Sequence, residues 1–154
     1  MQAYLRATLA GSMGTDQNRF NVMGEFGAVY LSLDAETPVQ ELRRTYQKLL
    51  GTDRPEDIAT GRILITLALH LRRVADLRDP TECAAWAIAP AAVNADELGP
   101  CQAAAREVRR TFEAIRYPSA TGKGENLAVF VDRLQPGSHI TLLDVQPLEA
   151  VWGN

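Results

Sequence analysis

Cysteine and histidine are scarce in this chain, and their scarcity weakens the case for a metal-binding site. The 154 residues include two cysteines, Cys83 and Cys101, and two histidines, His70 and His139. No CxxC pair and no Cys/His set with zinc spacing is present, so we expect no metal site. Each histidine is interpreted as a structural or surface residue. The low cysteine content is typical of a reducing compartment, and we expect a cytoplasmic protein.

Long hydrophobic runs are also missing. The longest apolar stretch, residues 63–71, is interrupted by Thr66 and His70 and is too short to cross a membrane. The N-terminal residues lack a basic segment followed by an apolar one. We therefore expect no signal peptide and no membrane partner.

The chain has no excess of positive charge, since 16 Lys and Arg against 19 Asp and Glu give a net charge of -3. Nucleic-acid binders usually carry a basic excess or a basic stripe. The arginine clusters here, such as the one between Arg106 and Arg110, are interrupted by acidic residues. We expect no direct nucleic-acid partner, although two or three isolated arginines can still hold a small anion.

What the chain does have is an ordinary globular composition, with 46% hydrophobic and 23% charged residues. A chain of this length is typical of one domain, which we place over residues 1–154. Strand-like and helix-like segments are interspersed, which predicts an α+β fold with a central sheet flanked by helices. The strands are expected at 3–9, 28–33, 62–71, 126–134 and 140–145, and the helices at 38–50, 81–88 and 100–115.

Two of these segments need a specific argument. Residues 62–71 are apolar on both sides, so periodicity cannot decide their structure, and their isoleucines and the preceding Gly61 favour a central strand. In the helix 38–50, Asp34 or Thr37 is a suitable N-cap and Gly51 a natural stop. Its expected apolar face contains Val39, Leu42, Tyr46 and Leu49. Thr81 is the expected cap of the helix 81–88.

Polar residues that are candidates for chemistry stand in three places. Asn18-Arg19-Phe20-Asn21 precedes a strand, Glu41 lies early in the helix that follows this strand, and Tyr117-Pro118-Ser119 precedes a glycine-rich turn. Each has an ordinary structural interpretation, because lone arginines, helix-face glutamates and serines after proline usually serve solvation, caps or turns. The turn at Gly122-Lys123-Gly124 lacks P-loop spacing and is interpreted as a plain turn.

Taken in order, these segments resemble the RES domain, a family named for an arginine, a glutamate and a serine. The similar stretches are RFNVMGEFGAVYLSLDAETPVQE, RILITLALHLRRVADLRDP and YPSATGKGENLAVF, which together span most of the chain. The resemblance places the catalytic arginine, glutamate and serine at Arg19, Glu41 and Ser119. It adds Phe20, Tyr30 and Asn126 to the residues that bind substrate, with Glu36 as a competing acid near Glu41.

The resemblance implies a fold related to ADP-ribosyltransferases and an enzyme for which NAD+ is the substrate, with no cofactor. It also implies the toxin of a type II toxin–antitoxin pair, whose partner is an Xre-type helix-turn-helix antitoxin in a hetero-oligomer. The activity is expected to be glycohydrolysis or phosphorolysis of NAD+. Transfer of ADP-ribose to a protein remains an alternative, and a non-enzymatic regulatory binding module is a third.

The chemistry of these residue types fits this expectation. Cleavage of the nicotinamide–ribose bond develops positive charge on the sugar, which the carboxylate of Glu41 can stabilise. A guanidinium such as that of Arg19 offers parallel donors to a pyrophosphate. Tyr30 can stack on nicotinamide. Ser119 can hold a ribose hydroxyl, a phosphate oxygen or the amide, and Asn126 can orient Ser119 or the turn.

Overall fold

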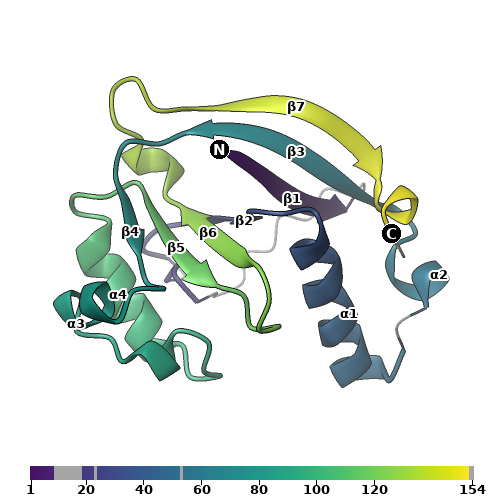
Figure 1. Ribbon diagram of the computed structural model, residues 1–154, viewed down its shortest axis with the longest axis horizontal. Coiled ribbons are helices and arrows are strands. Elements are labelled where there is room, and N and C mark those ends of the chain that lie inside the picture. The colour runs from purple at the N-terminus through teal and green to yellow at the C-terminus, as the bar shows by residue number, and fades with distance from the viewer. Residues whose placement is uncertain (9–18, 23, 53, 153–154) are drawn as a thin grey trace.

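The computed structural model describes residues 1–8, 19–22, 24–52 and 54–152, and over these residues the chain forms one seven-stranded sheet (Figure 1). The sheet order is β4-β5-β6-β2-β1-β3-β7, in which β4 and β5 pair in parallel and the other pairs are antiparallel. The strands are β1 (Gln2–Thr8), β2 (Val29–Ser32), β3 (Arg62–His70), β4 (Val74–Asp76), β5 (Ala114–Pro118), β6 (Glu125–Val129) and β7 (His139–Pro147).

The helices lie in two groups along the sheet, which confirms the predicted α+β class. Figure 1 shows α3 and α4 beside the β4–β5–β6 end, and α1 farther along toward β1 and β3. The helices are α1 (Glu36–Leu50), α2 (Pro55–Ile58), α3 (Pro80–Ala85) and α4 (Gly99–Val108), with the short 3-10 turns η1 (Pro90–Ala92), η2 (Val131–Arg133) and η3 (Leu148–Ala150).

Alternation along the strands divides the core between the two faces of the sheet. On one face, Ile115 and Tyr117 of β5 and Ala128 of β6 pack in a cluster with α3 and α4. On the other face, Leu127 and Val129 of β6 join a cluster with residues of β1, β2 and β3. A third cluster lies beneath α1 and includes Val39, Leu42, Leu64 and Leu148.

The prediction of a strand at 62–71 is confirmed, because β3 covers Arg62–His70. Its two apolar sides serve two cores, since Leu64 packs under α1 and Leu69 packs on the opposite face. The strand is not central, however, because it lies between β1 and the edge strand β7. His70 and His139 stack there, with ring centroids 5.3 Å apart.

The predicted helix at 100–115 is wrong from residue 109 onward. Helix α4 ends at Val108, and Ala114 and Ile115 belong to β5. Tertiary packing overrides local propensity here, because β5 is buried on both faces between β6 and the very short β4. Strand β6 likewise ends at Val129, and residues 131–133 form η2 instead of continuing it.

The ends of α1 and α3 follow the predictions in part. Ala35 occupies the N-cap position of α1, and the carboxylate of Asp34, one of the two expected capping residues, accepts hydrogen bonds from the backbone N–H groups of Glu36 and Thr37. Gly51 ends that helix at φ 66°, as predicted. Leu49 is 71% exposed and does not belong to the apolar face. Asp79, and not Thr81, caps α3.

Both cysteines are free and buried. Within the described ranges, no helix combines the length and the apolar character needed to cross a membrane.

Candidate active site

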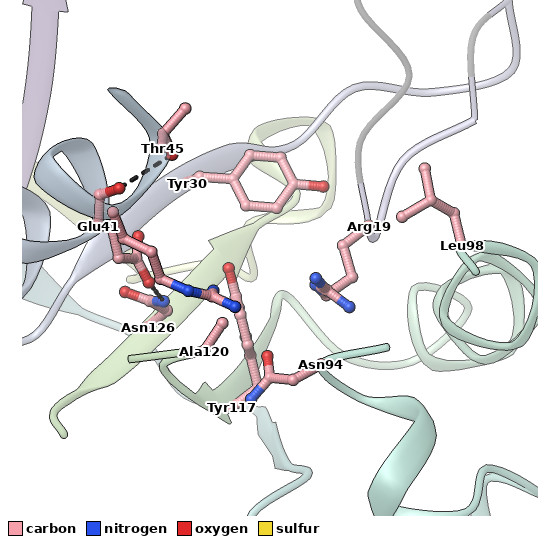
Figure 2. Close-up of a pocket in the computed structure, with 10 residues that line it drawn as sticks. Arg19, Tyr30, Glu41, Thr45, Asn94, Leu98, Tyr117, Ala120 and Asn126 are labelled. Atoms are coloured by element: carbon pink, nitrogen blue, oxygen red, sulfur yellow. Dashed lines mark hydrogen bonds between the residues drawn. The ribbon is translucent and has the colours of Figure 1, made fainter. Parts of the chain in front are cut away.

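A cavity of about 480 Å³ opens on the face of the sheet that carries the helices (Figure 2). In this view Glu41 and Asn126 lie on one side, Arg19 and Leu98 lie on the other, and the rings of Tyr30 and Tyr117 lie between them. The lining residues come from α1, from β2, β5 and β6, and from the segments around Arg19 and Asn94. They are Arg19, Tyr30, Glu41, Arg44, Thr45, Asn94, Leu98, Tyr117, Ala120 and Asn126.

Strand register places three polar side chains in one row across the sheet. Tyr117 of β5 pairs with Asn126 of β6, which in turn pairs with Ser32 of β2. Directly paired residues point to the same face of a sheet, so these side chains share the face that carries the cavity. Tyr30 lies two residues before Ser32 and therefore points to the same side.

Helix α1 brings Glu41 to this row. The helix begins next to the start of β6, where the backbone N–H of Leu33 donates to the carbonyl of Glu125 over 2.8 Å. The buried side chains of Val39 and Leu42 fix the rotation of the helix on the sheet. Glu41 lies between them in sequence and points to the cavity instead of to that core.

Two donors hold one oxygen of the Glu41 carboxylate. Ser119 Oγ donates to Glu41 Oε1 over 2.7 Å, and Asn126 Nδ2 donates to the same oxygen over 2.6 Å. Both donors are almost fully buried, with Ser119 2% and Asn126 5% exposed. Among the residues that the structure describes, Glu41 Oε2 has no hydrogen-bond partner. One oxygen is thus fixed by the protein, and the other remains for a ligand.

Ser32 sets the orientation of the Asn126 amide. Its hydroxyl donates to Asn126 Oδ1 over 2.9 Å, which turns the NH₂ group of the amide toward Glu41. Ser119 Oγ also lies 3.0 Å from Thr121 Oγ1 and accepts from the backbone N–H of Thr121. The contacts of Glu41 are therefore supported by a second set of hydrogen bonds.

Arg19 is anchored to the opposite wall by its own guanidinium. Its Nη1 donates to the carbonyl oxygens of Val93 and Ala95 over 2.6 and 2.9 Å. The intervening Asn94 donates from Nδ2 to the carbonyl of Pro118 over 3.0 Å. Residues 93–95 consequently connect Arg19 to the end of β5, one residue before Ser119.

Two tyrosines supply the aromatic walls and stay neutral. The Tyr30 hydroxyl accepts from the backbone N–H of Phe20 and donates to Asn21 Oδ1, both over 2.8 Å. Burial raises the pKa of Tyr30 to about 12. Burial also raises the pKa of Tyr117, as does the nearby charge of Glu41. At physiological pH both rings are therefore uncharged, and the hydroxyl of Tyr30 is occupied by the protein.

The comparison with known protein families identifies the family to which this chain belongs. The model of the RES domain matches residues 2–152, nearly the whole chain. This chain belongs to the RES-domain family. A similar solved structure is a chain of the M. tuberculosis MbcT–MbcA toxin–antitoxin complex, with a TM-score of 0.81, 22% identity, and coverage of 98% of this chain and 86% of that chain. This likeness shows a shared fold. No curated protein matches the chain.

In this RES domain the structure brings together most of the residues singled out from the sequence. Arg19, Tyr30, Glu41 and Asn126 line one cavity, and Ser119 is hydrogen-bonded to Glu41 from beneath. Phe20 is different, because it has no exposed surface and packs against Tyr117 with ring centroids 4.8 Å apart. In this structure it can support the cavity but cannot contact a ligand.

Glu36, the competing acid, is exposed in the first turn of α1 and lines a neighbouring cavity instead. Four further polar residues were missed. Tyr117 belongs to the segment that contains Ser119, and Arg44 lies one helical turn after Glu41. Their positions in the sequence could therefore have indicated a place in the site. No local pattern indicates a role for Asn94, which lies in a loop, or for Ser32, which acts through Asn126 on the neighbouring strand.

Proposed function

We propose that this RES domain is an enzyme that cleaves the nicotinamide–ribose bond of NAD+, which is its substrate, without a further cofactor. The observation that carries the proposal is how the carboxylate of Glu41 is hydrogen-bonded and what surrounds it. Its carboxylate is fixed at Oε1 by Ser119 and Asn126, Oε2 has no hydrogen-bond partner among the described residues, and Glu41 lines a cavity with two arginines and two aromatic rings. A carboxylate placed in this way suits a reaction in which positive charge develops on a sugar.

The proposed reaction uses the charge of Glu41 and needs no covalent intermediate. The bond between ribose C1 and the pyridinium nitrogen breaks, and its electron pair leaves with neutral nicotinamide. Glu41 Oε2 stabilises the positive charge that remains on the ribose. Water or inorganic phosphate then bonds to C1 from solution and loses a proton, which gives ADP-ribose or its 1″-phosphate.

The tyrosines fit the nicotinamide end of this substrate. The pyridinium ring of NAD+ carries a positive charge, and a neutral aromatic face attracts a cation. Tyr30 presents a ring whose hydroxyl is held by Phe20 and Asn21, so little freedom is lost on binding. After cleavage the leaving nicotinamide is neutral, and this attraction weakens.

Arg19→Ala is expected to raise KM for NAD+ about tenfold and to change kcat less, because a charged hydrogen bond to phosphate contributes mainly to binding. A guanidinium has five N–H groups, so its two bonds to carbonyls leave others for a pyrophosphate. Steady-state kinetics measures the effect, with Arg19→Lys as the variant that keeps the charge. An unchanged KM for Arg19→Ala would remove Arg19 from the binding site.

Ser32→Ala is expected to lower kcat about tenfold, although Ser32 does not line the cavity. Without its hydroxyl, the Asn126 amide is free to rotate and its NH₂ group no longer points reliably to Glu41. Kinetics on NAD+ should show the loss in kcat with little change in KM. A wild-type kcat in the folded variant would show that the amide needs no such support.

We further propose that the enzyme is the toxin of a type II toxin–antitoxin pair, that it acts in the cytoplasm, and that an Xre-type helix-turn-helix antitoxin binds it and blocks the cavity. Membership of the RES-domain family supports this role, as does the fold shared with a chain of a toxin–antitoxin complex. Degradation of NAD+ would explain toxicity.

Induced expression in bacteria without the antitoxin tests this role. Wild-type protein should deplete cellular NAD+ before growth stops, and Glu41→Gln protein at equal abundance should do neither. Co-expression of a helix-turn-helix protein encoded next to the gene should restore both. Growth arrest with a normal NAD+ level would mean that toxicity has another cause.

A further inference from the structure

A second cavity, of about 780 Å³, adjoins the first along α1. Its walls are the early turns of α1 and the turn between β5 and β6. Arg44 and Ala120 line both cavities, so these two residues mark the boundary between them. The proposed function uses only the first cavity, although the second is larger.

Arg44 is the cation at this boundary. It lies three residues after Glu41, and side chains with this spacing are neighbours on a helix. The side chain is exposed, and no salt bridge or ring contact engages it within the part of the chain that the structure describes. The adjacent Arg43, by contrast, lies over the ring of Trp152, with its guanidinium carbon 4.6 Å from the ring centroid.

The second cavity is lined by polar groups suited to a nucleoside. Gln40, Gln47 and Thr121 offer donors and acceptors for a base and a ribose. Arg43 and Lys123 add positive charge, and Asp34 and Glu36 add two carboxylates that can accept from hydroxyl or amino groups. None of these residues reaches the first cavity. A ligand that used both cavities would have two polar ends and an anionic middle at Arg44.

We propose that the dinucleotide spans both cavities, with its nicotinamide half beside Glu41, its pyrophosphate between Arg19 and Arg44, which both line the first cavity, and its adenosine half in the second cavity. This inference rests on the proposed function and deepens it. Two nucleoside halves joined by a pyrophosphate match two adjoining cavities with a cation between them. The second cavity then makes the enzyme favour dinucleotides over shorter nicotinamide compounds.

Replacement of Arg44 tests the boundary contact. Arg44→Ala is expected to raise KM for NAD+ at least tenfold with kcat within about threefold of wild type, because the lost contact is remote from the bond that breaks. Arg44→Lys, which keeps the charge, should recover part of this loss. Lys48→Ala is the matched control, since Lys48 is a cation on the same helix that lines neither cavity.

A bulky residue in the second cavity tests the position of the adenosine half. Gln40 is exposed and lines only the second cavity, so Gln40→Trp should obstruct part of it without disturbing the core. We expect this variant to raise KM for NAD+ about tenfold, and Lys48→Trp to leave it unchanged. Thermal melts confirm that each variant is folded.

The outcomes separate the two proposals. If wild-type protein does not consume NAD+, the proposed function itself is wrong. If wild-type protein consumes NAD+ and either Arg44→Ala or Gln40→Trp retains the wild-type KM, the reaction stands and the two-cavity inference is overturned.

Discussion

Glu41→Gln is expected to lower kcat for NAD+ cleavage about a thousandfold while leaving the fold intact. The substitution keeps an oxygen that can accept from Ser119 and Asn126, so the hydrogen bonds seen at Oε1 can form again. It removes only the negative charge and the second acceptor. The loss in rate therefore measures what the carboxylate charge contributes to the transition state.

The measurement is single-turnover and steady-state kinetics on NAD+, with circular dichroism to confirm the fold. Glu56→Gln is a suitable control, because Glu56 is an exposed helical acid that lines neither cavity and pairs with Arg54. It should retain wild-type kinetics. Substantial NAD+ consumption by folded Glu41→Gln protein would refute the role assigned to Glu41.

Glu113→Ala is expected to lower the free energy of unfolding by about 3 kcal/mol without changing kcat. This side chain has no exposed surface, yet it lies outside the cavity. Its Oε1 accepts from the backbone N–H of Arg72 over 3.0 Å and from Ser138 Oγ over 2.7 Å. Removal of the carboxylate leaves two partly buried donors without their acceptor and opens a small void.

Urea denaturation of wild type and variant measures the difference. Ser138→Ala removes one of the two partners and should cost only about 1 kcal/mol. Glu113 Oε2 is buried without a hydrogen bond among the described residues, so the site is under-satisfied even before substitution. A destabilisation by Glu113→Ala of less than 1 kcal/mol would show that this carboxylate contributes little net stability.

Periodic segments were the part of the fold that the sequence predicted well. The helix containing Glu41 had a capping acid, an apolar face and a terminal glycine, and all three recur in the structure except at Leu49. The segment Ala114–Pro118 was mispredicted because its strand character comes from burial on both faces and from pairing with β4, which is only three residues long. Neither effect is visible in local sequence.

The candidate site was likewise predictable from the sequence only in part. Arg19, Glu41 and Ser119 were singled out because their segments match a family pattern in order. The structure places Arg19 and Glu41 in the lining of one cavity, and Ser119 donates a hydrogen bond to Glu41. The role of Ser32 depends on strand register, which no local pattern gives. Phe20 was placed beside the substrate because the family pattern has an aromatic residue after the arginine, but Phe20 has no exposed surface and packs in the core against Tyr117.

The most direct test of the central claim is product analysis of NAD+ incubated with purified, antitoxin-free protein, with and without inorganic phosphate. Mass spectrometry should show one nicotinamide released for each NAD+ consumed, with the ADP-ribose portion recovered as a free small molecule or as its 1″-phosphate. NAD+ that stays intact in the presence of the folded protein, or ADP-ribose recovered only on protein, would contradict the account.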